Sequence, residues 1–217
     1  MYQYIKLYQM FTDFYQTYYL LIAVGIFSLK GFNDNSFVEK YLFIPYQIKH
    51  NNEWYRFFSH AFLHGDVGHL FFNGFTIFNF GPFFESYLNY LYGPQIGLIV
   101  FWGFVFIALI GSSAISYARN QNNPNYRALG LSGVVSAVLF AFIMIAPKTE
   151  LNFMFIPIPI TAYVFGIIYL AFEIYSDRNR KSGIAHDAHI GGAIVGILFI
   201  LFTNIELVIA NFNSLLP

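Results

Sequence analysis

The chain alternates between long apolar runs and shorter polar segments. A helix needs about 20 mainly apolar residues to cross the roughly 30 Å hydrocarbon core of a bilayer. The apolar runs therefore predict an all-α, polytopic membrane protein with one membrane domain, residues 1–217, and six spanning helices. We expect these helices at about residues 15–29, 67–84, 95–117, 132–146, 153–174 and 185–203.

The first connection, residues 30–66, is polar and aromatic along its length. It is too polar to span a bilayer and too rich in aromatic residues to be disordered. Because Trp and Tyr rings favour the headgroup level, we predict a structured loop at the membrane interface. Asp66 then reads as the N-cap of the second helix. Pro157 and Pro159 predict a kinked start of the fifth helix.

The composition supports this class of protein. Hydrophobic residues make up 57% of the chain and charged residues only 10%, which is typical of an integral membrane protein. The formal net charge is zero, and no basic stripe indicates a nucleic-acid partner. Cysteine is absent, which excludes thiol nucleophiles, disulfides and thiolate metal sites. Covalent catalysis would therefore need an oxygen or nitrogen nucleophile.

The fourth apolar run opens with Gly130-Leu131-Ser132-Gly133. A helix of about 15 residues is only about 22 Å long, so this helix must begin inside the membrane. Irregular backbone at that depth is tolerated only against protein or a water-filled cavity, and Ser132 sits at this point. The flanking glycines allow another backbone to approach the serine closely. Alternatively, the serine and glycines only pack helices together.

His189 lies at the start of the sixth helix and is followed by Gly192 and Gly196. This small-residue spacing lets the helix press against a neighbour, and Gly133 offers a matching position on the fourth helix. Such packing would bring His189 within reach of Ser132, as general-base activation of a hydroxyl requires.

His189 and Asn73 are polar groups inside predicted spanning helices, which marks them as functional candidates, and His69 lies one turn from Asn73 on the same face of the second helix. The alternative is that these groups only join neighbouring helices by hydrogen bonds. At this point the sequence resembles the rhomboid family of intramembrane serine proteases. The resemblance is carried by Tyr55-Arg56, His64 with His69 and Asn73, Gly130-x-Ser132-Gly133, and Ala188-His189 followed by Gly192 and Gly196.

The resemblance implies a function and a set of roles. Ser132 would be the nucleophile and His189 the general base, forming a dyad without an acid. His64, Asn73 and the Ser132 backbone N–H would form the oxyanion hole. The supporting residues would be His69, Arg56, Gly130, Gly133, Gly192, Gly196 and Glu85, the last a structural carboxylate near the far end of the second helix.

The resemblance also implies a setting for the reaction. The family fold is a six-helix bundle whose polar cavity opens to the extracytoplasmic face. The fifth helix and the long first loop would govern access of substrates, which are transmembrane proteins. No cofactor or metal is implied. From the apolar composition we expect an integral protein of the bacterial inner membrane, in contact with the lipid bilayer; an organelle membrane and the oligomeric state stay open.

The sequence departs from the family pattern at two positions. Ser136 stands where many members carry an aromatic residue that stacks on the histidine, so its hydroxyl is predicted to bond to His189 or to the backbone instead. Tyr55 stands where the family often has Trp. Asp187 does not complete a triad, because a residue two positions from His189 points to a different face of the helix.

The distribution of positive charge conflicts with the family orientation. In that orientation the cytoplasmic side carries only Lys6 and Lys148, and the positive-inside rule then predicts the reverse sidedness. The opposite side carries Lys30, Lys40, Lys49, Arg56, Arg119, Arg127, Arg178, Arg180 and Lys181. We retain the family orientation, because the positive charges of the long first loop could serve the structure of that loop rather than set the orientation of the chain.

Two other functions remain open from the sequence. An inactive rhomboid-like protein would bind transmembrane segments without cutting them. This alternative stays open because Ser136 replaces the aromatic residue that stacks on the histidine in many members. A metal-binding or transporting membrane protein would use imidazole ligands. Its candidate ligands are His60, His64, His69, His186 and His189.

Overall fold

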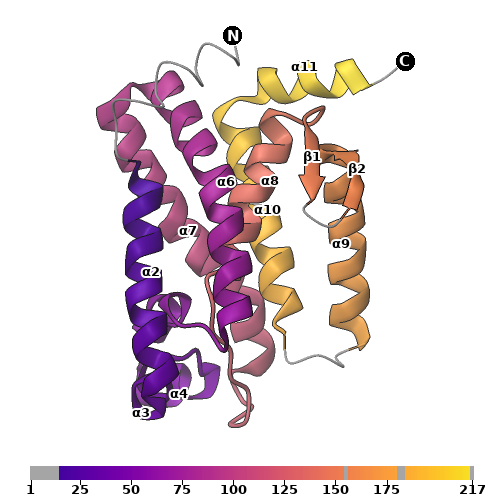
Figure 1. Cartoon of the computed structure of the whole chain (residues 1–217). Helices are drawn as coiled ribbons and strands as arrows, with labels where there is room; N and C mark the ends of the chain where they lie inside the picture. The colour runs from indigo at the N-terminus through magenta and orange to yellow at the C-terminus, as the bar shows by residue number, and fades with distance from the viewer. Residues whose placement is uncertain (1–14, 154–155, 180–183, 216–217) are drawn as a thin grey trace.

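The computed structural model describes residues 15–153, 156–179 and 184–215, and six long helices form its body (Figure 1). Lys6, Arg180 and Lys181 lie outside the described residues. The long helices are α2 (Gln16–Asn33), α6 (Val67–Tyr92), α7 (Pro94–Asn120), α8 (Ser132–Ile145), α9 (Ala162–Asn179) and α10 (His186–Thr203). By length and composition, two of them, α7 and α10, meet the requirements for crossing a membrane.

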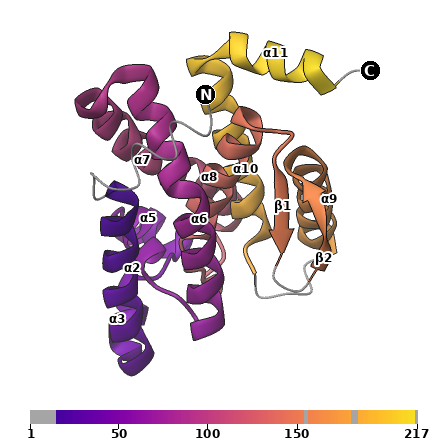
Figure 2. The ribbon, with the colours of Figure 1, turned by 45° about the horizontal axis from the view of Figure 1, so that its top comes forward.

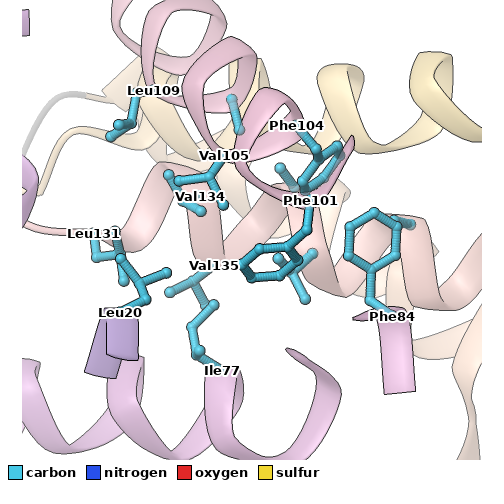
Figure 3. Packing of buried hydrophobic residues seen from close by; sticks show 14 of the residues in the cluster. Leu20, Ile77, Phe84, Phe101, Phe104, Val105, Leu109, Leu131, Val134 and Val135 are labelled. Carbon is cyan, nitrogen blue, oxygen red and sulfur yellow. The ribbon is translucent and has the colours of Figure 1, made fainter. Parts of the chain in front are cut away.

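Helix α8 is the centre of the bundle. Every residue from Gly133 to Ile143 is buried, because α6, α7, α9 and α10 surround the helix (Figure 2). Apolar side chains of α8, among them Val134 and Val135, meet Phe101 and Val105 of α7 and Ile77 of α6 in the main core (Figure 3). A short helix enclosed on all sides holds its first residue at a fixed place inside the protein.

The connection between α2 and α6 is compact. It contains α3 (Asn35–Tyr41), α4 (Pro45–Asn51), α5 (Arg56–Ser59) and the 3₁₀ turn η1 (His60–Phe62). The buried Arg56 guanidinium donates to the backbone carbonyls of Leu42 and Glu39 at 2.7 and 3.1 Å, and it also pairs with Glu53. Arg56 therefore ties the two halves of this loop together.

The expected fifth helix at 153–174 is wrong at its start. Two strands, β1 (Glu150–Phe153) and β2 (Ile156–Thr161), pair in antiparallel fashion here, with Glu150 opposite Thr161. A residue before proline is driven towards extended backbone, so the alternation of Ile and Pro in β2 favours a strand. Helix α9 begins only at Ala162, and the fold is mostly helical rather than all-α.

The second helix is longer than expected and ends at Tyr92, not near residue 84. Glu85 lies inside it and is buried, because its carboxylate caps the start of α2. It accepts hydrogen bonds from the backbone N–H groups of Gln16 and Thr17 at 2.8 and 3.1 Å and from the Thr17 hydroxyl at 3.1 Å. A carboxylate at a helix N-terminus satisfies free N–H groups and complements the helix dipole.

A final helix, α11 (Ile205–Leu215), was not expected, and it crosses the end of the bundle away from α3 and α4 (Figure 1). The Asn204 side chain caps its start by accepting from the Leu207 N–H at 3.1 Å. The Asn211 amide donates to the carbonyls of Met144 and Ile145 at 2.9 and 3.0 Å. Helix α11 thereby satisfies carbonyls at the end of α8.

Candidate active site

Ser132 is the first residue of α8 and is the one partly accessible residue in the otherwise buried stretch from Gly130 to Ile143. The backbone turns into the helix at Gly130, whose φ of +118° is unfavourable for residues with a side chain. The Gly130 N–H donates to the His60 carbonyl at 3.0 Å, which ties this turn to η1. The serine is therefore presented by a rigid turn.

His69 of α6 packs directly on Gly130. A Cβ atom at Gly130 would lie only 2.6 Å from Cε1 of the His69 ring, so a side chain does not fit there. The backbone N–H of His69 donates to its N-cap, Asp66, at 2.8 Å, as the sequence predicts for the start of this helix. His69 is also close enough to His189 for an electrostatic interaction between the two rings.

The glycines of α8 and α10 bring the two helices into backbone contact. A Cβ at Gly192 would overlap the Gly133 carbonyl oxygen, and one at Gly196 would overlap the Ala137 carbonyl oxygen. A Cβ at Gly133 would lie 3.4 Å from the Ala188 carbonyl oxygen. The neighbour of Ser132 in the chain thus touches the neighbour of His189, which places both candidate catalytic residues at one helix crossing.

His64 and Asn73 form a directed chain of hydrogen bonds. The Ser28 hydroxyl donates to the Phe62 carbonyl at 3.0 Å, so it accepts from His64 Nδ1 at 2.8 Å. With this proton on Nδ1, the Nε2 atom of His64 accepts from the Asn73 amide at 2.9 Å. Burial lowers the pKa of His64, in the loop before α6, and keeps the ring neutral.

This pattern of hydrogen bonds gives different roles to His64 and Asn73, the two side chains predicted for the oxyanion hole. The Asn73 amide keeps a second N–H to donate, whereas His64 in this tautomer orients Asn73 and has no free N–H. A donor role for His64 requires its proton to move to Nε2. Ser28, which fixes the tautomer, was missed by sequence reasoning, because a lone serine in an apolar run is indistinguishable from a packing residue.

The structure adds a carboxylate that the sequence interpretation overlooked. Glu173 of α9 is buried, with Oε2 at 2.6 Å from His186 Nδ1 and Oε1 at 3.1 Å from His189 Nδ1. The Glu173–His189 pair is within ion-pair distance, but His189 Nδ1 does not have the alignment of a hydrogen bond. The signal in the sequence was an acidic residue inside a predicted spanning helix, which marks a functional candidate by default.

Ser136 and Asp187 have partners other than His189. The Ser136 hydroxyl shares a hydrogen bond of 2.8 Å with the Tyr169 hydroxyl of α9, so it does not replace the stacked aromatic ring by bonding to His189. Asp187 accepts from the Ser116 hydroxyl at 2.7 Å and lies 3.6 Å from Arg119.

The histidines proposed as metal ligands are divided between separate environments. His60 Nδ1 lies 2.7 Å from the Arg56 carbonyl, and His64 is bonded as described above. In the described part of the chain, Glu173, His186 and His189 are the group whose potential ligand atoms lie within 4.8 Å of one another. Two ligands on a tetrahedral zinc ion are about 3.3 Å apart. The 2.6 Å contact between Glu173 and His186 is instead that of a hydrogen bond.

A small cavity lies behind Ser132. Its volume is about 20 Å³, enough for one water molecule. The polar side chains that line it are Ser132 itself, His60 of η1, and Ser112, Ser113 and Ser116 of α7. A water held here would lie beside the serine.

The fold is that of a helical membrane protein whose serine, imidazole and amide groups gather at one end of the bundle. Residues 51–205 match the family model described as the Rhomboid domain, and the chain belongs to the rhomboid family. The resemblance seen in the motifs is thereby confirmed, and family membership implies a polytopic membrane fold.

Two relatives extend this comparison. The chain is 33% identical over 147 residues to RHOMBOID-like protein 12, mitochondrial, of Arabidopsis thaliana, covering 64% of this chain and 43% of that protein. It is 26% identical over 179 residues to Rhomboid protease GlpG of Pectobacterium atrosepticum, covering 82% of this chain and 59% of that protein. The chain thus spans about half the length of these curated relatives.

Proposed function

We propose that this protein is an intramembrane serine endopeptidase that cleaves transmembrane segments of other membrane proteins. The observation that carries the proposal is the backbone contact of Gly133 with Ala188 and Gly192, because it sets Ser132 and His189 at one crossing of α8 and α10. The proposal includes a single domain with six spanning helices. It needs no cofactor.

The chemistry follows from the groups at this crossing. His189 accepts the Ser132 hydroxyl proton while the serine oxygen attacks the peptide carbonyl, and negative charge develops on the carbonyl oxygen. The Asn73 amide and the free N–H at the start of α8 can donate to that oxygen, each contributing about 3 to 4 kcal/mol of transition-state stabilisation. A substrate helix must unwind first, because its backbone bonds are internally satisfied.

For sidedness we propose that the end bearing Ser132 faces the extracytoplasmic side of a bacterial inner membrane. Several positive charges at this end have local structural partners, which supports a structural rather than a topogenic role for them. Arg119 pairs with Asp177 at 2.8 Å, Arg127 lies 3.8 Å from Glu39, and Lys49 donates to Asn122 at 2.8 Å. Alkaline phosphatase fused to the C-terminus should be inactive, and periplasmic activity of this fusion would refute the proposed orientation.

The activity is tested by cleavage of a model transmembrane substrate with detergent-purified protein. Wild type should cut and react with a fluorophosphonate probe, whereas Ser132→Ala and His189→Ala should do neither. An inert wild type that also fails to react with the probe would favour the rhomboid-like binding protein. Metal analysis of the same preparation tests the imidazole-ligand alternative.

A further inference from the structure

Helix α9 turns one carboxylate into the bundle. Among its described residues only Ala162, Gly166 and Glu173 are buried, and the Glu173 side chain is only 5% exposed. Two of these residues are small and allow close packing, whereas the third is ionisable. Burial of a carboxylate away from water is costly unless other groups pair with it. The position of Glu173 therefore calls for partners.

The partners are two imidazoles on one face of α10. His186 and His189 are three residues apart, so both face α9. Glu173 Oε2 is hydrogen-bonded to His186 Nδ1 at 2.6 Å, which fixes the carboxylate and leaves Oε1 facing His189 Nδ1 at 3.1 Å. This pair is within ion-pair distance but lacks hydrogen-bond alignment, and catalytic hydrogen bonds often tighten only when substrate is bound.

We propose that Glu173 is a positioning residue for His189 and completes a Ser132–His189–Glu173 triad. This inference rests on the proposed function and changes its mechanism, since the resemblance alone implies a dyad without an acid. The carboxylate holds the proton of the neutral ring on Nδ1. The Nε2 atom, on the opposite edge of the ring, is then the free base for the Ser132 hydroxyl.

The proton balance of the reaction is simple. As the bond between Ser132 Oγ and the carbonyl carbon forms, the hydroxyl proton moves to His189 Nε2, and the resulting imidazolium faces the Glu173 carboxylate. When the C–N bond breaks, the same proton moves to the leaving amine. Water then attacks the acyl-enzyme, giving a proton to Nε2, which returns it to Ser132 Oγ. Glu173 remains ionised throughout.

The neighbouring contact explains why an acid on α9 is useful in this chain. Ser136 cannot stack on the histidine ring as an aromatic residue would. Its hydroxyl instead bonds to Tyr169, one turn before Glu173 on α9. Helix α9 therefore supplies two contacts: Tyr169 bonds to Ser136 of α8, and Glu173 faces the His189 ring of α10.

The test compares Glu173→Gln with wild type in the cleavage assay. Gln keeps the size of the side chain but lacks the charge, and its NH₂ group favours the wrong tautomer of His189. We expect kcat to fall by at least about tenfold with KM changed less than about twofold, and fluorophosphonate labelling to slow in proportion. Glu173→Asp should recover part of the lost kcat.

The matched control is Asp177→Asn. Asp177 lies one turn further along α9 and pairs with Arg119 at 2.8 Å, and its side chain is more exposed than that of Glu173. This variant should keep kcat within about twofold of wild type. Equal losses in both variants would show that the carboxylates only dock α9, and an unchanged kcat in Glu173→Gln would also overturn the proposal.

A spectroscopic measurement separates this inference from the proposed activity. In Ser132→Ala protein with ¹⁵N-labelled histidines, assigned with His189→Asn, the neutral His189 ring should show the Nδ1–H tautomer. Adding Glu173→Gln should give a mixture of tautomers or the Nε2–H form. An unchanged tautomer would refute the role of Glu173, whether or not wild type cleaves substrates.

Discussion

Gly192 of α10 lies so close to Gly133 of α8 that a methyl group on Gly192 would overlap the Gly133 carbonyl oxygen. The obstacle is backbone, so no side chain can rotate away to relieve it. Gly133 is also enclosed on the side of α7, where a Cβ would lie 2.5 Å from Ser112 Oγ. The position of Ser132 thus depends on a backbone contact between α8 and α10 and on the close packing of the Ser112 side chain of α7 against Gly133.

This contact predicts a large effect of Gly192→Ala. Overpacking at a rigid contact costs about 1 to 3 kcal/mol, which exceeds the gain of up to about 1 kcal/mol in helix propensity. The thermal unfolding midpoint in detergent should therefore fall by several degrees. The rate at which the protein cleaves a model substrate should fall as well. Gly103→Ala is the control, because Gly103 of α7 has nothing within 4 Å of its Cβ position. Equal midpoints for both variants would contradict the contact.

A second prediction concerns the hydrogen-bond chain through Asn73. Asn73→Ala should lower kcat by about 10² or more, because it removes a donor to the oxyanion. Ser28→Ala should cost less, since it only frees the tautomer of His64. Asn79→Ala, which alters an exposed amide of the same helix bonded to the Phe75 carbonyl, should leave kcat unchanged. A larger loss in Ser28→Ala than in Asn73→Ala would reverse the roles we assign.

A third prediction tests whether Tyr169 fills the space beside Ser136. Ser136 is 1% exposed and bonded to Tyr169, so Ser136→Phe should destabilise the protein by about 1 to 3 kcal/mol. Tyr169→Ala vacates that space. The double variant should therefore be more stable than the sum of the single changes predicts, by about 1 kcal/mol or more in the free energy of unfolding. Additive changes would mean that the two side chains do not compete for one volume.

Much of the helix packing could be predicted from the sequence, because it depends on the spacing of small residues within each helix. The glycines at 133, 192 and 196 predicted which two helices touch, and the structure has this contact. The antiparallel pair of β1 and β2 was not predicted, since an alternation of Ile and Pro has the hydropathy of a helix but not its backbone preference.

Glu173 illustrates a different limit. Its place inside the predicted helix 153–174 marked it as a candidate, but its role depends on two histidines 13 and 16 residues later in the chain. Only the packing of α9 against α10 brings them together. Likewise, the role of Glu85 at the start of α2 depends on residues almost 70 positions away. Pairings of this kind have no local signature.

The last prediction concerns pH and the two buried histidines of the loop before α6. Burial lowers the pKa of His60 to about 4 and that of His64 to about 3, whereas a histidine in the unfolded chain has a pKa of about 6.5. Below that value the unfolded chain binds more protons than the folded one. Each histidine should therefore remove up to about 1.4 kcal/mol of stability per pH unit as the pH falls from about 6 to 4.5.

The measurement is the pH dependence of the free energy of unfolding in detergent, compared between wild type, His64→Gln and His50→Gln. His64→Gln should have a shallower slope below pH 6, whatever its absolute stability, because one proton-binding difference is removed. His50 of α4 is exposed, so its replacement should leave the slope unchanged. If His64→Gln keeps the wild-type slope, the His64 ring is not held neutral by burial, and the direction of its hydrogen bonds to Ser28 and Asn73 must be reassigned.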